Sequence, residues 1–367
     1  MLLFLDSFDH YSDAQKLEKW TQLTVGNVFG DTTIQAVGRR SSNGIRMRTT
    51  NASNNSKADF LHLVPAMPLP ADAAVVLGFA FRSVTAFSGM GSNGTSPTAA
   101  GTSALFTALY QSTEQFWARL NINGTISVLR GTTVLGTTGT ALQENVYSYL
   151  EFKVLISDSV GTVNVAINGI SEISLTGQNT RNGSVSAWDE LRMGTVSNGA
   201  AGTIAQEWNF DDLYLTDSSG SGWTGFKGDT RMDVLLPSAN GAVRDWTPST
   251  GTDDFAVVDE NPPNGDTDYL SASVVGDEVS LVFPDAPVVG ADIHGIQLSA
   301  YGRKTDSGAS GHKALARIGS TNFLGTERGL GSAYAFKREP WDLSPATSAA
   351  WTESEFNAAQ FGAEKSS

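Results

Sequence analysis

Residues 147–156 have the sequence YSYLEFKVLI, and residues 161–169 continue with GTVNVAING. Every second residue is apolar in both segments, from Leu150 onward in the first and from Val163 onward in the second. Alternation with a period of two is typical of a strand with one buried face, and an Asn-Gly pair such as Asn168-Gly169 favours a hairpin turn. We therefore expect two half-buried antiparallel strands here.

A third segment, residues 208–217 (WNFDDLYLTD), predicts one more strand with the carboxylate pair Asp211 and Asp212 at its start. Eight Asn-Gly dipeptides are spread along the chain, and several of them lie between alternating apolar runs. They begin at Asn43, Asn93, Asn123, Asn168, Asn182, Asn198, Asn240 and Asn264. Such pairs accept the positive φ angles of two-residue hairpin turns, so the pattern predicts an antiparallel, hairpin-rich protein.

The segments quoted above resemble the late strands of a concanavalin-like or laminin-G-like jelly roll. We expect an all-β protein with a jelly-roll sandwich over residues 1–217 and a second, smaller β-sandwich-like domain over residues 218–367. The boundary is placed in residues 217–222 (DSSGSG), because small polar residues cannot build a core. Capping-box patterns predict only two short helices, from Ser12 to Trp20 and from Thr352 to near Gly362.

Composition excludes several classes of function. The 367 residues include no cysteine, which rules out thiol catalysis, Cys-zinc sites and disulfides. The net charge of −14 argues against nucleic acid as the main partner. The apolar start lacks the basic region of a signal peptide, and no later run has the length of a membrane span, so we expect no membrane insertion.

Candidate catalytic groups are few. A jelly-roll glycosidase of the laminarinase type carries its two carboxylates on one strand, but no Glu-x-Asp-x-x-Glu pattern occurs. Glu207 and Asp211 would share a face of one extended strand but lie four residues, about 13 Å, apart along it, too far for either glycosidase geometry. The four histidines show no spacing typical of a zinc site, and no Gly-x-Ser-x-Gly motif is present. No catalytic and no cofactor-binding residue is predicted.

One metal site is a hypothesis. Acids near the first and last strands of a jelly roll can bind a structural Ca²⁺ through oxygen, and Asp6 or Asp9 with Asp211 or Asp212 would supply them. We select Asp6 and Asp212 as the predicted Ca²⁺ ligands. In the alternative interpretation, Asp212 caps a turn or hydrogen-bonds a loop backbone.

Eight tryptophans suggest that an aromatic ring stacks on a sugar. Trp117 alternates with the apolar residues of its strand and is the best candidate for an outward-facing ring. The alternative is that the tryptophans fill core edges or subunit contacts, as expected for those that flank predicted elements. These are Trp20, Trp208, Trp246, Trp341 and Trp351.

Charge is distributed unevenly in the second half. Between Gly251 and Ser280 there are eight acidic residues and no Lys or Arg, and a basic group of Arg303, Lys304, Lys313 and Arg317 follows. This asymmetry could pair subunits across an interface, or it could describe two solvated loops.

A family resemblance adds an expectation about function. Residues 4–11 (FLDSFDHY), 210–214 (FDDLY), 228–237 (GDTRMDVLLP) and 246–249 (WTPS) resemble segments of virion structural proteins of tailed bacteriophages. Shorter similarities continue at residues 258–260, 268–270, 351–352 and 361–362. Such proteins look like a jelly roll joined to a second β domain, and they serve as minor tail, tail-fibre, collar or head-surface components without known catalytic residues.

The resemblance implies a non-enzymatic virion protein, assembled in the host bacterial cytoplasm. Its implied partners are other virion proteins, further copies of itself in a trimer or hexamer, and a host-surface glycan. The implied mechanism is adhesion through many weak sites held on one particle. The alternative is a free carbohydrate-binding, lectin-like protein or a glycosidase-related jelly roll.

Overall fold

The computed structural model describes residues 1–20, 22–23, 30–49, 57–58, 61–63, 74–90, 103–197, 206–220 and 222–367. The chain divides into two compact units. The first comprises Met1, Leu3–Asp9 and Trp20–Met232, and the second comprises Leu2, His10–Lys19 and Asp233–Ser367. Residues 218–232 thus belong to the first unit, although the sequence analysis places them in the second domain. Independent folding of residues 1–217 stays a prediction. No helix of the described residues is long and apolar enough to span a membrane.

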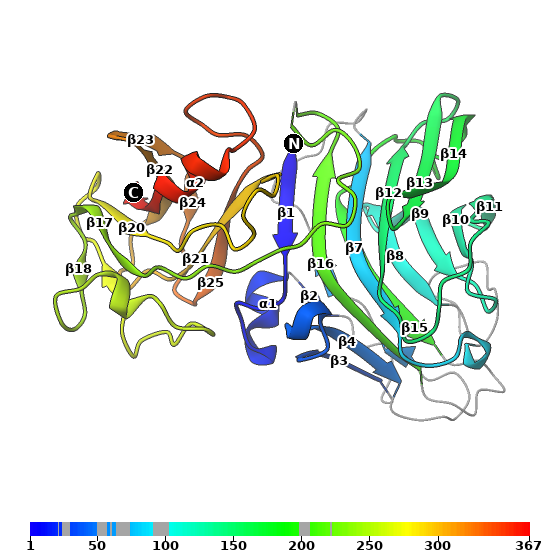
Figure 1. Cartoon of the computed structure of the whole chain (residues 1–367), viewed down its shortest axis with the longest axis horizontal. Coiled ribbons are helices and arrows are strands. Elements are labelled where there is room, and N and C mark those ends of the chain that lie inside the picture. The colour runs from blue at the N-terminus through cyan, green and yellow to red at the C-terminus, as the bar shows by residue number, and fades with distance from the viewer. Residues whose placement is uncertain are drawn as a thin grey trace. The chain divides into compact units, whose positions relative to one another are not determined.

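The first unit contains two antiparallel sheets (Figure 1). In spatial order, the first sheet consists of β14 (Ile170–Gln178), β13 (Gly161–Ile167), β12 (Ser148–Leu155), β7 (Val75–Ser83), β16 (Glu207–Asp217), β4 (Gly44–Thr49) and β3 (Gly30–Gln35), and β1 (Leu2–Asp6) also pairs with β16. The second consists of β11 (Thr133–Thr137), β10 (Ile126–Arg130), β9 (Thr113–Leu120), β8 (Ala104–Tyr110), β15 (Glu190–Ser197), β6 (Leu61–Leu63) and β2 (Gln22–Leu23), and β5 (Lys57–Ala58) also pairs with β15.

The hairpin expected from residues 147–169 is confirmed. β12 pairs with β13 in antiparallel register, with Leu150 opposite Ile167. Asn168 and Gly169 have φ angles of 51° and 77° and connect β13 to β14 in the turn that the Asn-Gly pair predicts.

The core of the first unit lies between its two sheets. Phe79 of β7 and Phe152 of β12, both in the first sheet, contact Phe106 of β8 in the second, with ring centroids 6.5 Å and 4.8 Å from that of Phe106. All three rings are buried. Because side chains alternate along a strand, the residues between them point to the outer faces of the sheets.

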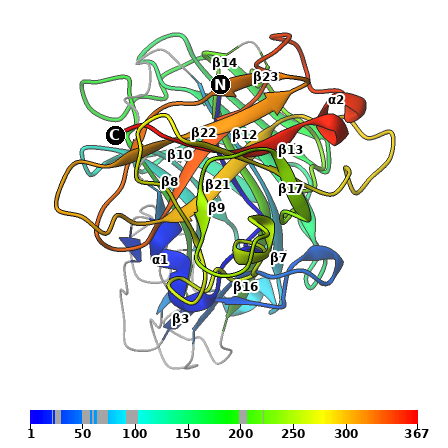
Figure 2. The ribbon, with the colours of Figure 1, turned by 90° about the vertical axis from the view of Figure 1, so that its left-hand side faces the viewer.

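The second unit is also built of strands (Figure 2). Its main sheet consists of β17 (Ala239–Arg244), β20 (Glu278–Val282), β26 (Gln360–Lys365), β22 (Gly311–Ile318) and β23 (Thr321–Leu324), and β24 (Arg328–Gly329) pairs with β22. Two further pairs are β18 (Thr247–Pro248) with β19 (Leu270–Ser271), and β21 (Ile296–Gly302) with β25 (Ala335–Trp341). A core around Trp351 and Phe361 packs against Ile296 and Trp341 of β21 and β25. The all-β prediction is therefore confirmed for both units.

Helices are few and short, as expected. The segment from Ser12 contains the 3-10 turn η1 (Asp13–Gln15) and α1 (Lys16–Lys19), and α2 covers Glu353–Ala358. The Thr352 hydroxyl accepts from the Glu355 amide at 3.2 Å, which confirms the predicted cap. The second helix ends before the expected position near Gly362, because β26 begins at Gln360. The remaining 3-10 turns are η2 (Arg39–Ser41), η3 (Phe87–Gly89) and η4 (Phe255–Val257).

The acidic and basic groups of the second half meet inside the second unit. Asp266, from the acidic stretch, pairs with Arg303 at 2.9 Å and accepts from the Tyr334 hydroxyl at 2.8 Å. Lys313 pairs with Glu364 of β26 at 3.1 Å. Part of the charge asymmetry is thus balanced within the chain, and its use in an interface stays a prediction.

Candidate functional site

The carboxylate pair of β16 lies at an irregularity of the strand. The register of β16 against β7 shifts between Asp211 and Tyr214, and Asp212 has a φ of 49°. A non-glycine residue with positive φ is uncommon, and Asp tolerates it better than most. Both carboxylates are buried, so they need partners within the protein.

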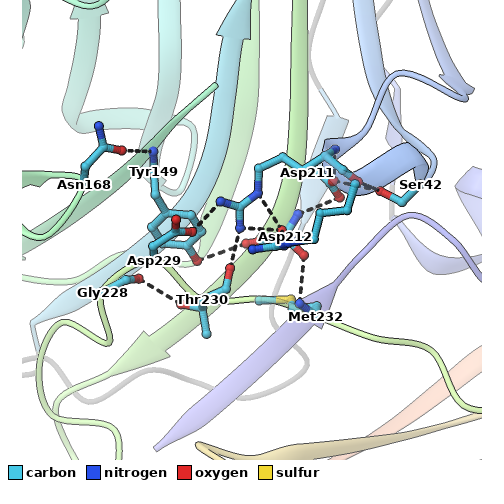
Figure 3. A network of polar contacts seen from close by, with 11 residues as sticks. Ser42, Tyr149, Asn168, Asp211, Asp212, Gly228, Asp229, Thr230 and Met232 are labelled. Atoms are coloured by element: carbon cyan, nitrogen blue, oxygen red, sulfur yellow. Dashed lines mark hydrogen bonds and ion pairs between the residues drawn. The ribbon is translucent and has the colours of Figure 1, made fainter. Parts of the chain in front are cut away.

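Asp212 lies in a network of polar contacts with Met232 (Figure 3). Its main partner is Arg39. Its Nε and Nη2 donate to Asp212 Oδ2 at 2.9 Å and 2.6 Å, and Nη2 also donates to the Thr230 carbonyl at 2.6 Å. Nη1 pairs with Asp229, and the guanidinium lies over the Tyr149 ring at 5.2 Å. Arg39 therefore joins β16 to residues 229–230.

The two Asp212 oxygens have different partners. While Oδ2 faces Arg39, Oδ1 accepts from the Met232 amide at 2.8 Å. Asp212 thus hydrogen-bonds a backbone outside the sheet, as the alternative to calcium predicts. Asp211 accepts from the amides of Arg39 at 2.6 Å and Asp212 at 2.8 Å. Burial, and then the charge of Asp212, raises the pKa of Asp211 from 3.8 to about 7.

Asp6 ends β1, which pairs with β16, and its carboxylate is also engaged by donors of the chain. Its Oδ1 accepts from the Phe8 amide and its Oδ2 from Trp20 Nε1, both at 2.8 Å. Asp9 Oδ1 accepts from the Asn43 amide at 2.7 Å. No group of three or more His, Asp or Glu side chains among the described residues is arranged to hold a metal. Calcium binding stays a prediction, and the contacts of Asp6 and Asp212 do not favour it.

Trp117 lies on the outer face of its sheet as expected, but the exposure expected for it is wrong. Its side chain is 0% exposed, its Nε1 donates to the Gly131 carbonyl at 2.8 Å, and it packs with Ala104 and Leu129. Alternation along β9 does place Trp117 on the face opposite Phe116, but it does not tell whether that face is covered. Trp117 has no free ring face on which a sugar could stack.

A different group of side chains lies on the same outer face of the second sheet. In the backbone register, Leu109 of β8 is opposite Glu190 of β15 on one side and Glu114 of β9 on the other. Residues directly opposite each other share a face, so both glutamates point to the side away from the core. Arg192 follows Glu190 by two residues and shares this face. We call Glu114, Glu190 and Arg192 the outer-face cluster.

The outer-face cluster contains one ion pair and one carboxylate without a partner. Arg192 Nε and Nη2 lie 2.6 Å and 3.3 Å from the two Glu190 oxygens. Within the described residues, the half-buried Glu114 carboxylate has no hydrogen-bond or ion-pair partner. Burial raises the pKa of Glu114, and the charge of Arg192 opposes this effect. Perturbed carboxyl groups that the protein leaves unpaired are candidates for ligand contact.

Sequence reasoning missed this cluster because it looked for two acids on one strand. Glu114 and Glu190 come from different strands, 76 positions apart, and only the pairing of β9, β8 and β15 brings them to one face. The single local signal was the spacing Glu190-Leu191-Arg192, which places opposite charges on the same side of a strand.

Comparisons with known proteins support the fold. No family model matches the chain, and no curated protein matches its sequence. Similar solved structures include an endo-β-1,4-glucuronan lyase from the fungus Trichoderma reesei, with 12% identity over 59% of this chain and 95% of the lyase and a TM-score of 0.43. The lectin UEA-II complexed with galactose has 9% identity over 59% and 99%, with a TM-score of 0.37. A GH131 β-glucanase catalytic domain from Podospora anserina has 10% identity over 60% and 97%, with a TM-score of 0.38.

These likenesses bear on fold class, and the concanavalin-like jelly-roll sandwich expected from the sequence is confirmed. They also correct one expectation. The prediction that the chain is not an enzyme is withdrawn, since a lyase, a glucanase and a lectin all occur among the structures of similar fold, and TM-scores of 0.37 to 0.43 assign neither role to this chain. The jelly roll is a fold of proteins that bind carbohydrates and of enzymes that cleave them, so the fold does not exclude catalysis.

Proposed function

We propose that the chain is a carbohydrate-binding jelly-roll protein and that the outer-face cluster contacts the glycan. The observation that carries the proposal is Glu114, a half-buried carboxylate that no group of the described chain satisfies. A partly desolvated carboxylate without a donor from the protein is open to a donor from a ligand, and perturbed groups of this kind mark candidate binding sites.

The chemistry of the cluster suits sugar hydroxyl groups. A hydroxyl both donates and accepts, so one sugar hydroxyl can donate to Glu114 while a neighbouring one accepts from Arg192. The ion pair with Glu190 holds the guanidinium in a fixed orientation. A ligand would therefore meet an acceptor and a donor that are already in place, which lowers the entropy cost of binding.

We further propose that this binding serves adhesion on a virion. The support is the sequence resemblance of residues 4–11, 210–214 and 228–237 to segments of tailed-phage structural proteins. In such a setting several copies would act together, so weak individual sites would give strong attachment. Other virion proteins and a trimeric or hexameric assembly are the partners that this setting requires.

The test is binding of the full-length chain to alginate, glucuronan, β-glucan and galactose-containing glycans, first on an array and then by calorimetry. Glu114→Ala should weaken binding at least about tenfold. Its melting temperature should stay the same or rise, because the carboxylate has no hydrogen bond to lose and its desolvation cost is removed. Asp158→Ala, which removes an exposed carboxylate paired with Arg181 in the loop after β12, is the control and should leave binding unchanged. Equal binding by wild type and Glu114→Ala would refute the assignment of the cluster.

A second candidate function is cleavage of the bound glycan. Glu114 and Glu190 lie two strands apart on one face, a backbone spacing of about 9.6 Å, close to the carboxyl separation of inverting glycosidases. Glu114, with its raised pKa, is suited to give a proton to the leaving oxygen. Glu190 would take a proton from the attacking water.

Release of reducing ends from the same polysaccharides measures this activity. Glu114→Gln and Glu190→Gln should each abolish cleavage, and binding should survive at least one of the two changes. Binding without any cleavage would leave the first proposal standing and exclude the second.

A further inference from the structure

The chain that follows β16 is held against the jelly roll. We call residues 223–232 the strap. Thr216 Oγ1 of β16 donates to the Trp223 carbonyl at 3.2 Å, and Lys153 Nζ of β12 donates to the Thr224 carbonyl at 2.6 Å. The Trp223 ring meets the Tyr214 ring edge to face with centroids 5.0 Å apart. The strap therefore covers the outer face of the first sheet along β12 and β16.

A single buried carboxylate holds the middle of the strap. Glu151 of β12 is 1% exposed. Its Oε1 accepts from the Tyr214 hydroxyl at 2.6 Å, from the Lys227 amide at 2.7 Å and from the Gly228 amide at 3.0 Å. Its Oε2 is buried and has no hydrogen-bond partner. Oε1 thus accepts all three hydrogen bonds, and Oε2 accepts none.

This arrangement suits a carboxylic acid better than a carboxylate. An ionised group would bury a full charge with one oxygen left unsatisfied, which is costly. A proton on Oε2 removes the charge and leaves Oε1 as a carbonyl oxygen that still accepts the two strap amides. The new O–H donor has no acceptor among the described residues, but a neutral hydroxyl without a partner costs less than a buried charge without one. We propose that Glu151 is a proton-dependent latch, in which the neutral side chain holds the strap on the sheet and ionisation loosens it.

Among the described residues, no cation forms an ion pair with Glu151. On β12 its neighbours on the same face are Tyr149 and Lys153, and Lys153 donates to the strap carbonyl instead. On β16 the group that faces it is Tyr214. Directly opposite residues are Gly78 on β7 and Ala166 on β13, and neither carries a charge.

The strap itself brings two charged groups. Asp229 adds a negative charge that opposes ionisation of Glu151. Lys227 Nζ donates to the Gly222 carbonyl at 2.9 Å and lies over the Trp223 ring at 5.3 Å. Within the described residues Glu151 therefore has no ion-pair partner.

The direction of the pH effect follows from burial. Desolvation raises the pKa of Glu151 in the closed state, against the lowering effect of the Tyr214 hydroxyl and the strap amides. A group whose pKa is raised on closing binds a proton more tightly in the closed state. Closing is therefore favoured at acid pH and weakens as the pH rises through the raised value. This latch is separate from the outer-face cluster, which lies on the other sheet.

Hydrogen exchange of the full-length chain tests the latch, with protection corrected for the intrinsic exchange rate at each pH. Between about pH 5 and about pH 9, protection of the amides of Lys227 and Gly228 should fall at least about tenfold. The Asn168 amide, which donates to the Tyr149 carbonyl in the hairpin turn, is the internal control and should not change. Glu151→Gln keeps the acceptor and cannot ionise, so its strap should remain protected at both pH values.

Two results would overturn the proposal: greater strap protection in the wild type at about pH 9, or loss of protection in Glu151→Gln at both pH values. Either would mean that the carboxylate is the form that holds the strap. If Glu151→Gln does not fold, Tyr214→Phe replaces it. Removing a donor to the carboxylate should move the pH midpoint of strap release upward, and an unchanged midpoint would also refute the latch.

Discussion

The outer face of each jelly-roll sheet carries a partly or fully buried glutamate, but the two carboxyl groups differ in the hydrogen bonds that the protein supplies. Glu151, on the first sheet, lies under the strap and accepts three hydrogen bonds from the protein. Glu114, on the second sheet, is only half buried and accepts none within the described residues. The number of partners that the chain supplies thus separates a structural carboxylate from a candidate for ligand binding, although burial raises the pKa of both.

The strongest test of the covered face is Arg39→Ala. The change removes the closer ion pair of Asp212 and leaves this buried carboxylate only the longer, more exposed pair with Arg40, so we expect the first unit to lose up to about 3–5 kcal/mol of stability. Chemical denaturation measures the loss. Arg48→Ala is the control, because its contact with Glu207 is 3.9 Å long and partly exposed and should contribute about 1 kcal/mol or less. Similar losses in the two variants would show that the pair of Arg39 with Asp212 stabilises the fold no more than an exposed ion pair does.

The pH dependence of stability tests the same network through Asp211. Its pKa is raised from 3.8 to about 7 in the folded chain. The stabilising contribution of its proton is complete below the unfolded value and is lost as the pH rises through the folded value. We expect the first unit to lose up to about 3–4 kcal/mol between about pH 4 and pH 8 from this group. Denaturation curves of Asp211→Asn should show a flatter profile, and an equally steep profile would assign the effect to other groups.

Close packing under Tyr214 gives a smaller predicted effect. A Cβ atom at Gly78 would lie 2.2 Å from Tyr214 Cε1, and the Tyr214 hydroxyl is held by Glu151. Gly78→Ala should therefore destabilise the first unit by about 1–3 kcal/mol, as measured by its melting temperature. Gly329→Ala, where nothing lies within 4 Å of the added atom, is the control. A neutral Gly78→Ala would mean that the Tyr214 ring moves freely.

The smallest effect is expected from calcium. The oxygens of Asp6 and Asp212 accept from donors of the chain, so a chelator or added Ca²⁺ should shift the melting temperature by no more than about 1 °C. A larger stabilisation by Ca²⁺ would show that one of these carboxylates changes its partners.

Much of the local structure could be predicted from the chain. The pairing of β12 with β13 and the Asn168-Gly169 turn between β13 and β14 follow from alternation and turn chemistry, which depend on neighbouring residues alone. The Thr352 cap follows for the same reason. Local patterns failed where another part of the chain covers a surface. Trp117 was placed on the correct side of its strand, but its burial depends on residues that alternation does not describe.

The sequence by itself determined the all-β class, the antiparallel hairpins and the absence of cysteine chemistry, because each depends on residue type and short spacing. The tertiary structure alone decided what the carboxylates do. Pairing of β15, β8 and β9 brought Glu114 and Glu190 to one face, and folding of the strap over β12 gave Glu151 its partners. Both outcomes depend on contacts between residues about 75 positions apart in the sequence. The pKa of a carboxyl group depends on its burial and on its neighbours in space, and a local sequence pattern contains neither.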